Sequence, residues 1–279
     1  MSVVSARGAL DFESAQFSET VAAIARTHAA PDPWTPGAAC SDAADELDSA
    51  LADAGFGELG TEPGLLALAG PVGLELGRAL AALRPLDRLL GGALVSGSVV
   101  RYPADGVPLV TVGRGRLELA EAVELRPVPY ADSLGASALC GSRASRTVEG
   151  AEAAMRMAAW IAASTGYLAG VCAAALALAL EHTRSRVAFG RPLAALEPVQ
   201  QTLADAATLS DGLALLAADM PGPDALAHAG GAAVEALAGC QQVTGALGFT
   251  LEFPMQRAYR RARSCRAWNE AVLAAWGEP

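Results

Sequence analysis

Arg186-Val-Ala-Phe-Gly190 is the stretch that decides the fold of this 279-residue chain. It follows a long alanine-rich segment whose apolar composition predicts a helix from about residue 149 to residue 182. Fifty-two residues beyond Gly190, a second glycine-rich stretch begins at Gln242 and reads Gln242-Val-Thr-Gly-Ala-Leu-Gly-Phe-Thr250. Each stretch interrupts long helical patterns, so together they indicate two turns of a helical bundle.

Helical patterns continue to the end of the chain. After the first helix, apolar residues predict a second from about 198 to 220, which Pro221-Gly-Pro223 ends. A third, over residues 224–244, is the least secure because Gly230 and Gly231 each cost about 1 kcal/mol relative to alanine. Pro254 suits the first turn of a last helix that runs toward Trp276.

Upstream of the bundle the pattern changes twice. Residues 1–91 read as helices separated by proline and glycine. Residues 92–147 contain β-branched runs broken by Asp105-Gly106 and by Gly113-Arg-Gly115, which indicate short antiparallel strands. The order predicts an α+β protein that is mostly α: an N-terminal helical domain (1–91), a small β domain (92–147) and a C-terminal four-helix bundle (148–279).

Composition excludes several functional classes. The chain has no lysine, all 20 basic residues are arginine, and the net charge of −10 argues against nucleic acid as a partner. Five scattered cysteines form no CxxC or Cys/His pattern, so neither a metal site nor a disulfide framework is predicted. No secretory signal is visible at the N-terminus, and we expect a cytoplasmic protein with reduced thiols.

A transmembrane helix is the alternative interpretation of one segment. Met157 to Leu180 is uncharged over 24 residues and contains glycines at 166 and 170. Length and the GxxxG spacing both suit a membrane span. However, ten of these residues are alanine, and no basic cluster or aromatic belt flanks them. We therefore expect the central helix of a soluble bundle and no membrane partner.

The two stretches and their spacing resemble the C-terminal domain of the acyl-CoA dehydrogenases. That family shows R-x-x-F-G, then a Gln, then L-A-D, and later Q-x-x-G-G-x-G-[FY]. The corresponding residues of this chain are Arg186, Phe189, Gly190, Leu203-Ala-Asp205, Gln242, Gly245, Gly248 and Phe249, with Glu197 in place of the family's Gln and Ala246 in place of its second glycine. The resemblance is strongest between Gly170 and Trp268, and Glu75-Leu-Gly-Arg-Ala79 resembles a stretch of the family's N-terminal domain.

The resemblance implies a flavin site that contains FAD. The family's Arg in R-x-x-F-G reaches across a subunit interface to the FAD diphosphate, and a guanidinium suits phosphate because it forks onto two oxygens. The resemblance therefore implies that Arg186, Phe189 and Gly190 bind the cofactor and that Gln242 and Gly245 lie near its adenylate end. The structural alternatives are a helix-end cation for Arg186 and a helix C-cap for Gly245.

The catalytic base of the family is missing from both usual positions. The reaction needs a carboxylate that removes the α-proton of an acyl-CoA thioester while a hydride passes to the flavin. Counted from Gln242, one family position falls on Asn269; counted back from Gly170, the other falls on Trp160. Neither side chain is a base. Glu270 is the remaining candidate, although one residue along a helix points about 100° away.

These departures, together with a β domain that lacks the family's flavin-ring motifs, favour a short, divergent member. It resembles subunits of bacterial heteromeric acyl-CoA dehydrogenases, some of which act in steroid or other lipid catabolism. We therefore expect a homo- or hetero-oligomer with a full-length acyl-CoA dehydrogenase subunit. Two alternatives remain: a self-sufficient enzyme that uses Glu270, and a catalytically silent structural or regulatory partner.

A cluster of arginines near the C-terminus has two interpretations. Five arginines fall between residues 257 and 266, and Arg260-Arg-Ala-Arg263 resembles a family stretch in which Arg261 is an Asp. Such a cluster is usually a solvated face. The functional alternative is contact with an anionic partner, such as a cofactor phosphate or an acidic subunit.

Overall fold

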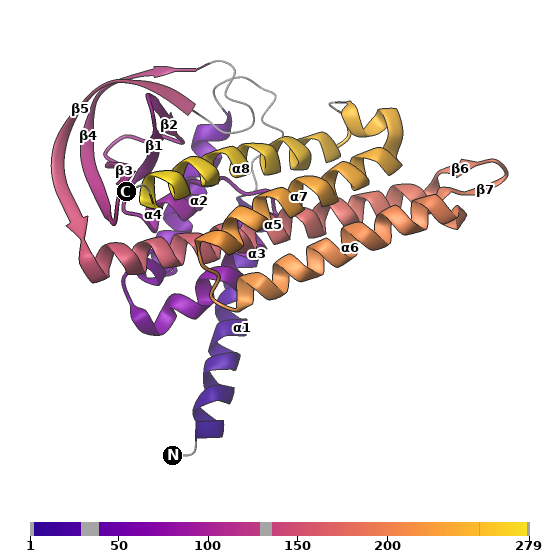
Figure 1. The fold of residues 1–279 in the computed structure, drawn as a ribbon, viewed down its shortest axis with the longest axis horizontal. Helices are drawn as coiled ribbons and strands as arrows, with labels where there is room; N and C mark the ends of the chain where they lie inside the picture. The colour runs from indigo at the N-terminus through magenta and orange to yellow at the C-terminus, as the bar shows by residue number, and fades with distance from the viewer. Residues whose placement is uncertain (1–2, 29–38, 129–135, 251, 278–279) are drawn as a thin grey trace.

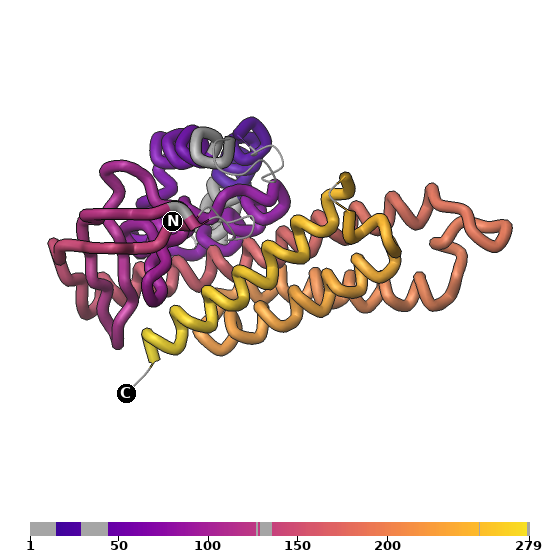
Figure 2. The backbone as a smooth tube through the Cα atoms, turned by 90° about the horizontal axis from the view of Figure 1, so that it is seen from above, coloured from indigo at the N-terminus to yellow at the C-terminus, as the bar shows by residue number. Residues whose placement is uncertain are grey.

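The order of elements is the predicted one. Our computed structural model describes residues 3–28, 39–128, 136–250 and 252–277. Helices lead into a small barrel of strands, and a bundle of long helices follows (Figure 1). The barrel and the N-terminal helices sit together at one end of the bundle, and the other end of the bundle projects away from them (Figure 2). The α+β, mostly α class is confirmed.

The N-terminal helices pack through apolar faces against the bundle. Val21, Leu47, Leu51 and Leu76 are buried in one continuous core. Just after α3, Leu80 adopts a left-handed backbone conformation, and the short helix α4 follows before the barrel. The helices are α1 (Val3–Thr27), α2 (Ala39–Asp53), η1 (Phe56–Gly60), η2 (Pro63–Leu68), α3 (Ala69–Arg78) and α4 (Arg84–Arg88).

Five strands close into a barrel in the order β1-β2-β5-β4-β3. They are β1 (Ala93–Ser96), β2 (Val99–Arg101), β3 (Leu109–Gly113), β4 (Arg116–Pro127) and β5 (Ala136–Glu149). The expectation of antiparallel strands alone was incomplete, because β1 pairs in parallel with β3 and this pairing closes the barrel. Strand β5 was not predicted, since its residues are small or charged and mostly exposed, which removes the apolar alternation that marks a strand.

The C-terminal bundle consists of α5 (Gly150–Ser185), α6 (Glu197–Ala218), α7 (Pro223–Thr244) and α8 (Met255–Gly277). A short hairpin of β6 (Val187–Ala188) and β7 (Arg191–Pro192), then η3 (Leu193–Ala195), joins α5 to α6. The turn η4 (Gly245–Phe249) follows α7. Helix α7 forms despite its glycine pair, and the side chain of Arg266 from α8 packs against Gly230.

Helix α5 occupies the centre of the molecule. Within the described chain it is the one helix long and apolar enough to cross a membrane, and 72% of its most apolar window is buried. Every residue from Ala159 to Cys172 is buried, against α3 on one side and the other bundle helices on the other. This cover favours the core-helix interpretation of the uncharged segment.

The GxxxG spacing of α5 serves a contact inside the protein. A Cβ built on Gly166 would clash with the carbonyl oxygen of Gly70 on α3, and one on Gly170 would clash with that of Leu74. From the other side, a Cβ on Gly73 would meet the carbonyl oxygen of Ala163 at well under 3.0 Å. The backbones of α3 and α5 therefore touch directly, and only glycine permits this crossing.

This crossing predicts a contrast between two glycines in helices. Gly166→Ala should lower the free energy of unfolding by about 1–3 kcal/mol or more, because the new methyl meets backbone that cannot move aside. Gly212→Ala in α6 is the matched control, since nothing lies within 4 Å of its built Cβ. It should raise stability by up to about 1 kcal/mol. Urea unfolding of both variants checks this, and equal effects would contradict the close crossing.

Candidate functional site

Arg186 lies at the junction between α5 and the β6–β7 hairpin. Its backbone N–H caps α5 by donating to the His182 carbonyl at 2.8 Å, and its own carbonyl accepts from Leu193 N–H at 2.9 Å. These bonds fix the backbone, while the residue itself is exposed. Arg184 and Arg191 are also exposed on this part of the chain. The hairpin thus presents guanidinium groups to solvent.

The Phe-Gly pair of the motif forms the turn of this hairpin. Phe189 has φ 54° and Gly190 has φ 77°, so both central residues adopt the positive φ that a two-residue type I′ turn requires. Positive φ is costly for phenylalanine, and its ring is 91% exposed. A strained, exposed aromatic side chain is typical of a functional contact.

The second motif forms the turn after α7. Gln242 is exposed in the last turn of the helix, and Gly245 ends it with φ 62°, so the C-cap interpretation of Gly245 agrees with the structure. The turn is held from inside, because Gln241 Nε2 donates to the Gly248 carbonyl at 3.2 Å. Nothing lies within 4 Å of a Cβ built on Gly245 or on Gly190, so both backbones are open to approach.

Both turns lie at the end of the bundle that projects away from the barrel (Figures 1 and 2). His182 on α5 packs edge-on against Phe253, at 5.8 Å between ring centroids, which links this end of α5 to the segment before α8. Arg186, Phe189, Gly190, Gln242 and Gly245 are therefore surface residues. This surface can bind an anion through exposed guanidinium groups and open backbone.

A buried ion pair near the barrel contacts Trp160 and Trp268. Asp87 of α4 and Arg101 of β2 form a bidentate pair with almost no exposure. Trp160 donates its indole N–H to Asp87 Oδ1 at 3.4 Å. The Arg101 guanidinium lies over the ring of Trp268, at 5.1 Å from its centroid, and Asn269 is the next residue. This region is filled by the protein's own side chains.

Electrostatics support a fixed pair rather than a reactive acid. Burial raises the pKa of the Asp87 carboxyl, while the Arg101 charge acts to lower it. Burial lowers the pKa of the Arg101 guanidinium, but Asp87 more than offsets this and the net pKa is raised. Both partners are held by two hydrogen bonds, so neither is free to exchange protons with a substrate.

Arg261 corrects the solvated-face interpretation of the C-terminal arginines. It is 4% exposed and donates to the Ala81 carbonyl at 2.7 Å and to the Tyr167 hydroxyl. Burial raises the pKa of Tyr167, which keeps the phenol neutral as an acceptor. Arg263 and Arg266 are exposed, as expected. The cluster therefore divides between the core and the surface.

Glu270 lies on the outer side of α8. Its carboxylate accepts from Arg266 Nε at 2.7 Å, and about half of each side chain is exposed. Asn269, its neighbour, is 3% exposed and has a buried Nδ2 with no hydrogen-bond partner. The candidate base thus faces solvent, while the position that the family uses faces the core.

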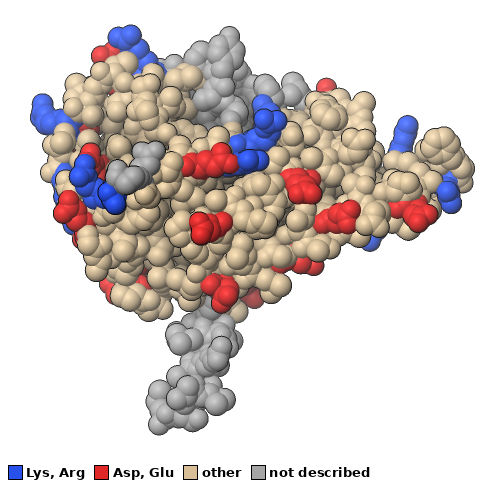
Figure 3. All heavy atoms as spheres, viewed as in Figure 1, with Lys and Arg blue, Asp and Glu red and all other residues tan. Residues whose placement is uncertain are grey.

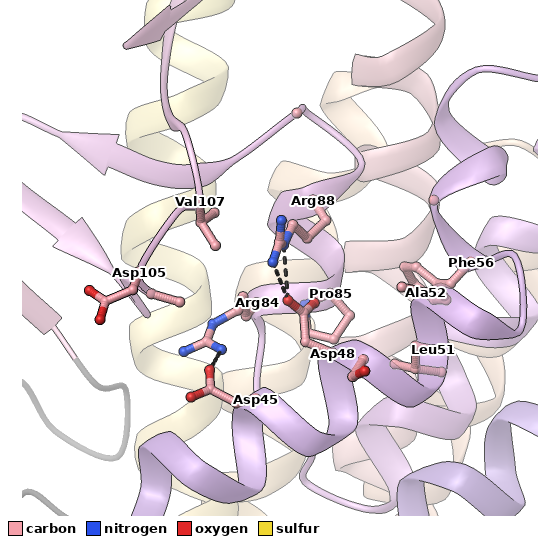
Figure 4. Close-up of a pocket in the computed structure, with 14 residues that line it drawn as sticks. Asp45, Asp48, Leu51, Ala52, Phe56, Arg84, Pro85, Arg88, Asp105 and Val107 are labelled. Atoms are coloured by element: carbon pink, nitrogen blue, oxygen red, sulfur yellow. Dashed lines mark hydrogen bonds and ion pairs between the residues drawn. The ribbon is translucent and has the colours of Figure 1, made fainter. Parts of the chain in front are cut away.

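A hollow of about 630 Å³ lies elsewhere, between α2, η1, α4 and the loop after β2. Figure 4 shows two ion pairs in it, Arg84 with Asp45 and Arg88 with Asp48, beside apolar residues that include Leu51 and Phe56. None of the predicted flavin residues lines this hollow. It is separate from the candidate site.

Comparison with known proteins agrees with the resemblance. The family model "Acyl-CoA dehydrogenase, C-terminal domain" matches residues 148–220. A cyclohex-1-ene-1-carbonyl-CoA dehydrogenase of Syntrophus aciditrophicus (strain SB) is 34% identical over 107 residues, which are 34% of this chain and 26% of that protein. The matched stretch thus spans about a quarter of the length of this relative.

Solved structures extend the likeness over the whole fold. A steroid acyl-CoA dehydrogenase variant, Tcur3481-Tcur3483, aligns with a TM-score of 0.65 at 18% identity and covers 95% of this chain and 97% of its own. The ChsE4-ChsE5 complex of Mycobacterium tuberculosis aligns at 0.64 and 19%, with 94% and 93% covered. Glutaryl-CoA dehydrogenase of Mycobacterium smegmatis aligns at 0.66 and 16%, with 94% of each chain covered.

Residues 148–220 thus match the C-terminal domain of the acyl-CoA dehydrogenase family, and the chain as a whole shares the fold of these solved structures.

The chain shares the fold of these structures, and its interior contains a buried ion pair. Sequence reasoning named the residues of the two turns but missed Asp87 and Arg101, which contact Trp160 and Trp268. A signal was present: Arg84, Asp87 and Arg88 interrupt an otherwise apolar run between residues 79 and 95. Charges inside such a run indicate buried ion pairs.

Loss of the buried carboxylate should destabilise this homologue strongly. Asp87→Asn leaves the Arg101 charge buried without its partner, and we expect a loss of about 3–5 kcal/mol in the free energy of unfolding. Glu270→Gln is the control, because its exposed pair should contribute at most about 1 kcal/mol. Replacing both members by Asp87→Leu and Arg101→Met should cost less than Asp87→Asn alone. Chemical denaturation measures all three; similar losses for Asp87→Asn and Glu270→Gln would show that the pair is not structural.

Proposed function

We propose that the chain is a subunit of a heteromeric, FAD-dependent acyl-CoA dehydrogenase. Together with a full-length partner it forms a shared flavin site at which an acyl-CoA thioester is desaturated between its α and β carbons. This chain contributes Arg186, Phe189, Gly190, Gln242 and Gly245. The partner contributes the catalytic base.

One observation carries the proposal: the residues expected to bind the cofactor are exposed, whereas the residues at the expected base positions are buried. The five residues of the two turns are on the surface at the projecting end of the bundle, where a second chain can reach them. The base positions, Trp160 and Asn269, are buried, and Trp160 donates a hydrogen bond to the buried Asp87. A site assembled from two chains accommodates both facts.

The surface at the turns fits a flavin dinucleotide. Arg186 is exposed and can fork onto diphosphate oxygens. The open backbones at Gly190 and Gly245 allow close approach of the adenylate end, and a side chain at either position would be strained by the positive φ. When bound, FAD supplies the acceptor for the β-hydride. The exposed Phe189 ring offers a flat apolar face that excludes water from the same interface.

The buried core explains why a partner is required. The chemistry needs a carboxylate close to the thioester, and the exposed, ion-paired Glu270 is not aimed at the core. Structures similar in fold include complexes of two named chains, one of them a steroid acyl-CoA dehydrogenase. By analogy, we propose a role in steroid or other lipid catabolism in the cytoplasm.

A silent structural or regulatory partner is the second candidate. The filled, ion-paired region at the base positions favours it, because the chain's own interior has no described opening there. Under this alternative the turns contact the partner chain but not a flavin.

Flavin absorbance separates the two candidates. We expect the chain alone to purify without a flavin band, and a band at about one flavin for each pair of chains when it is co-expressed with its partner among the full-length acyl-CoA dehydrogenase chains of its own genome. The visible spectrum of each preparation gives the result. A band in the chain alone would overturn the shared site, and a colourless complex would favour the silent partner.

Arg186 provides the sharper test. Arg186→Ala should weaken FAD binding by about 10–100-fold in the complex, since hydrogen bonds to charged groups contribute roughly 1.5–3 kcal/mol. Arg184→Ala removes a neighbouring exposed arginine at the end of α5 and is the matched control. Titration with FAD, followed by flavin fluorescence, compares the two. Equal affinities would remove Arg186 from the site.

A further inference from the structure

The ribbon formed by β4 and β5 extends beyond the strands that cover it. Strand β2 pairs with β5 only at residues 136–138, and β3 pairs with β4 only at residues 116–120. In the described part of the chain, no strand lies along the outer edge of β5 from Cys140 to Glu149. In Figure 1 this edge of the arching ribbon faces outward. Outward N–H and C=O groups there remain available for pairing.

Both surfaces of the middle of this ribbon are exposed. All residues from Ser142 to Thr147 and from Glu121 to Glu124 are exposed, and the Val123 side chain is 67% exposed. A two-stranded ribbon without cover is marginal in water. The free edge and the bare faces together point to a surface that is covered in an assembly.

A β-bulge in β5 places two arginines on the same face of the ribbon. Arg146 lies opposite Leu119 and Ala144 lies opposite Ala120, which leaves Ser145 as the extra residue. Since Arg143 lies opposite Glu121, two positions from Leu119, the bulge brings Arg143 and Arg146 to the same face. Arg146 also contacts Glu152 at 3.2 Å. Within the described residues, Arg143 has no carboxylate within 4.0 Å and is exposed.

We propose that this free edge of β5, residues 140–147, docks an extended strand of the heteromeric partner chain, and that carboxylates on that strand meet Arg143. Backbone hydrogen bonds supply most of the attraction, as in other cases of strand addition. A second copy of this chain is a poor occupant, because residues 140–147 contain two arginines and no acidic residue, so two such edges would bring like charges together. This inference rests on the proposed heteromer and adds a second contact, at the barrel end, to the one at the turns.

Hydrogen exchange tests the docking directly. The chain is measured alone and in complex with the partner chain found by co-expression, and the readout is amide exchange in the segment 140–147. We expect exchange there to slow at least tenfold in the complex. Complex formation with unchanged exchange in this segment would overturn the docked strand and leave the flavin proposal standing. A protected edge in a colourless complex would support the docking and overturn the shared flavin site, and failure to form any complex would overturn both.

A charge reversal tests the arginine contact. Arg143→Glu should raise the Kd of the complex about tenfold, with a larger effect at low salt. Arg114→Glu in the exposed turn between β3 and β4 makes the same charge change away from the free edge. Arg143→Ala separates loss of attraction from repulsion and should give an intermediate Kd. Equal Kd values for the two reversals would overturn the contact.

Discussion

The direct contact between the backbones of α3 and α5 sets the position of everything else. Glycines on both helices remove the side chains that normally keep helices 8–10 Å apart. Because α5 is the central helix of the bundle, this contact anchors the N-terminal helices to it without an intervening layer. The order of the chain then places the barrel at the same end, since α4 begins six residues and β1 fifteen residues after the end of α3.

The crossing also creates the polar centre of the molecule. Helix α3 ends at Arg78, and Leu80 adopts a left-handed conformation with φ 48°, so that Ala81 N–H bonds back to the Leu76 carbonyl at 3.0 Å. The Ala81 carbonyl then accepts hydrogen bonds from Tyr167 and Arg261. Three parts of the chain that are far apart in sequence meet at this one carbonyl. Asp87 and Arg101 extend the same polar layer toward the barrel.

Sequence reasoning predicted what depends on local pattern. The four bundle helices follow from apolar spacing and from proline and glycine, and their observed ends lie within about three residues of the predicted ones. The end of the first bundle helix near residues 186–190 was predicted, but the two-residue turn at Phe189-Gly190 was not, because phenylalanine does not signal a positive φ. Strand β5 was not predicted, because its own residues do not favour a strand and its conformation depends on pairing with β4. The buried role of Arg261 was missed for a similar reason: its acceptor, Ala81, is 180 residues away.

Charge distribution favours the asymmetric assembly over a symmetric one. No arginine occurs between residues 192 and 256, and the face seen in Figure 3 carries scattered acidic side chains, with arginines at its two ends and one group near its middle. The ends are the places where the flavin-type turns and the free edge of β5 lie. A copy of the same chain would set its acidic bundle face against another acidic face, which costs free energy at low ionic strength. A different chain can complement both the acidic side chains and the arginines at once. The exposed turns of the bundle and the free edge of β5 are therefore the two surfaces at which a second, different chain can bind.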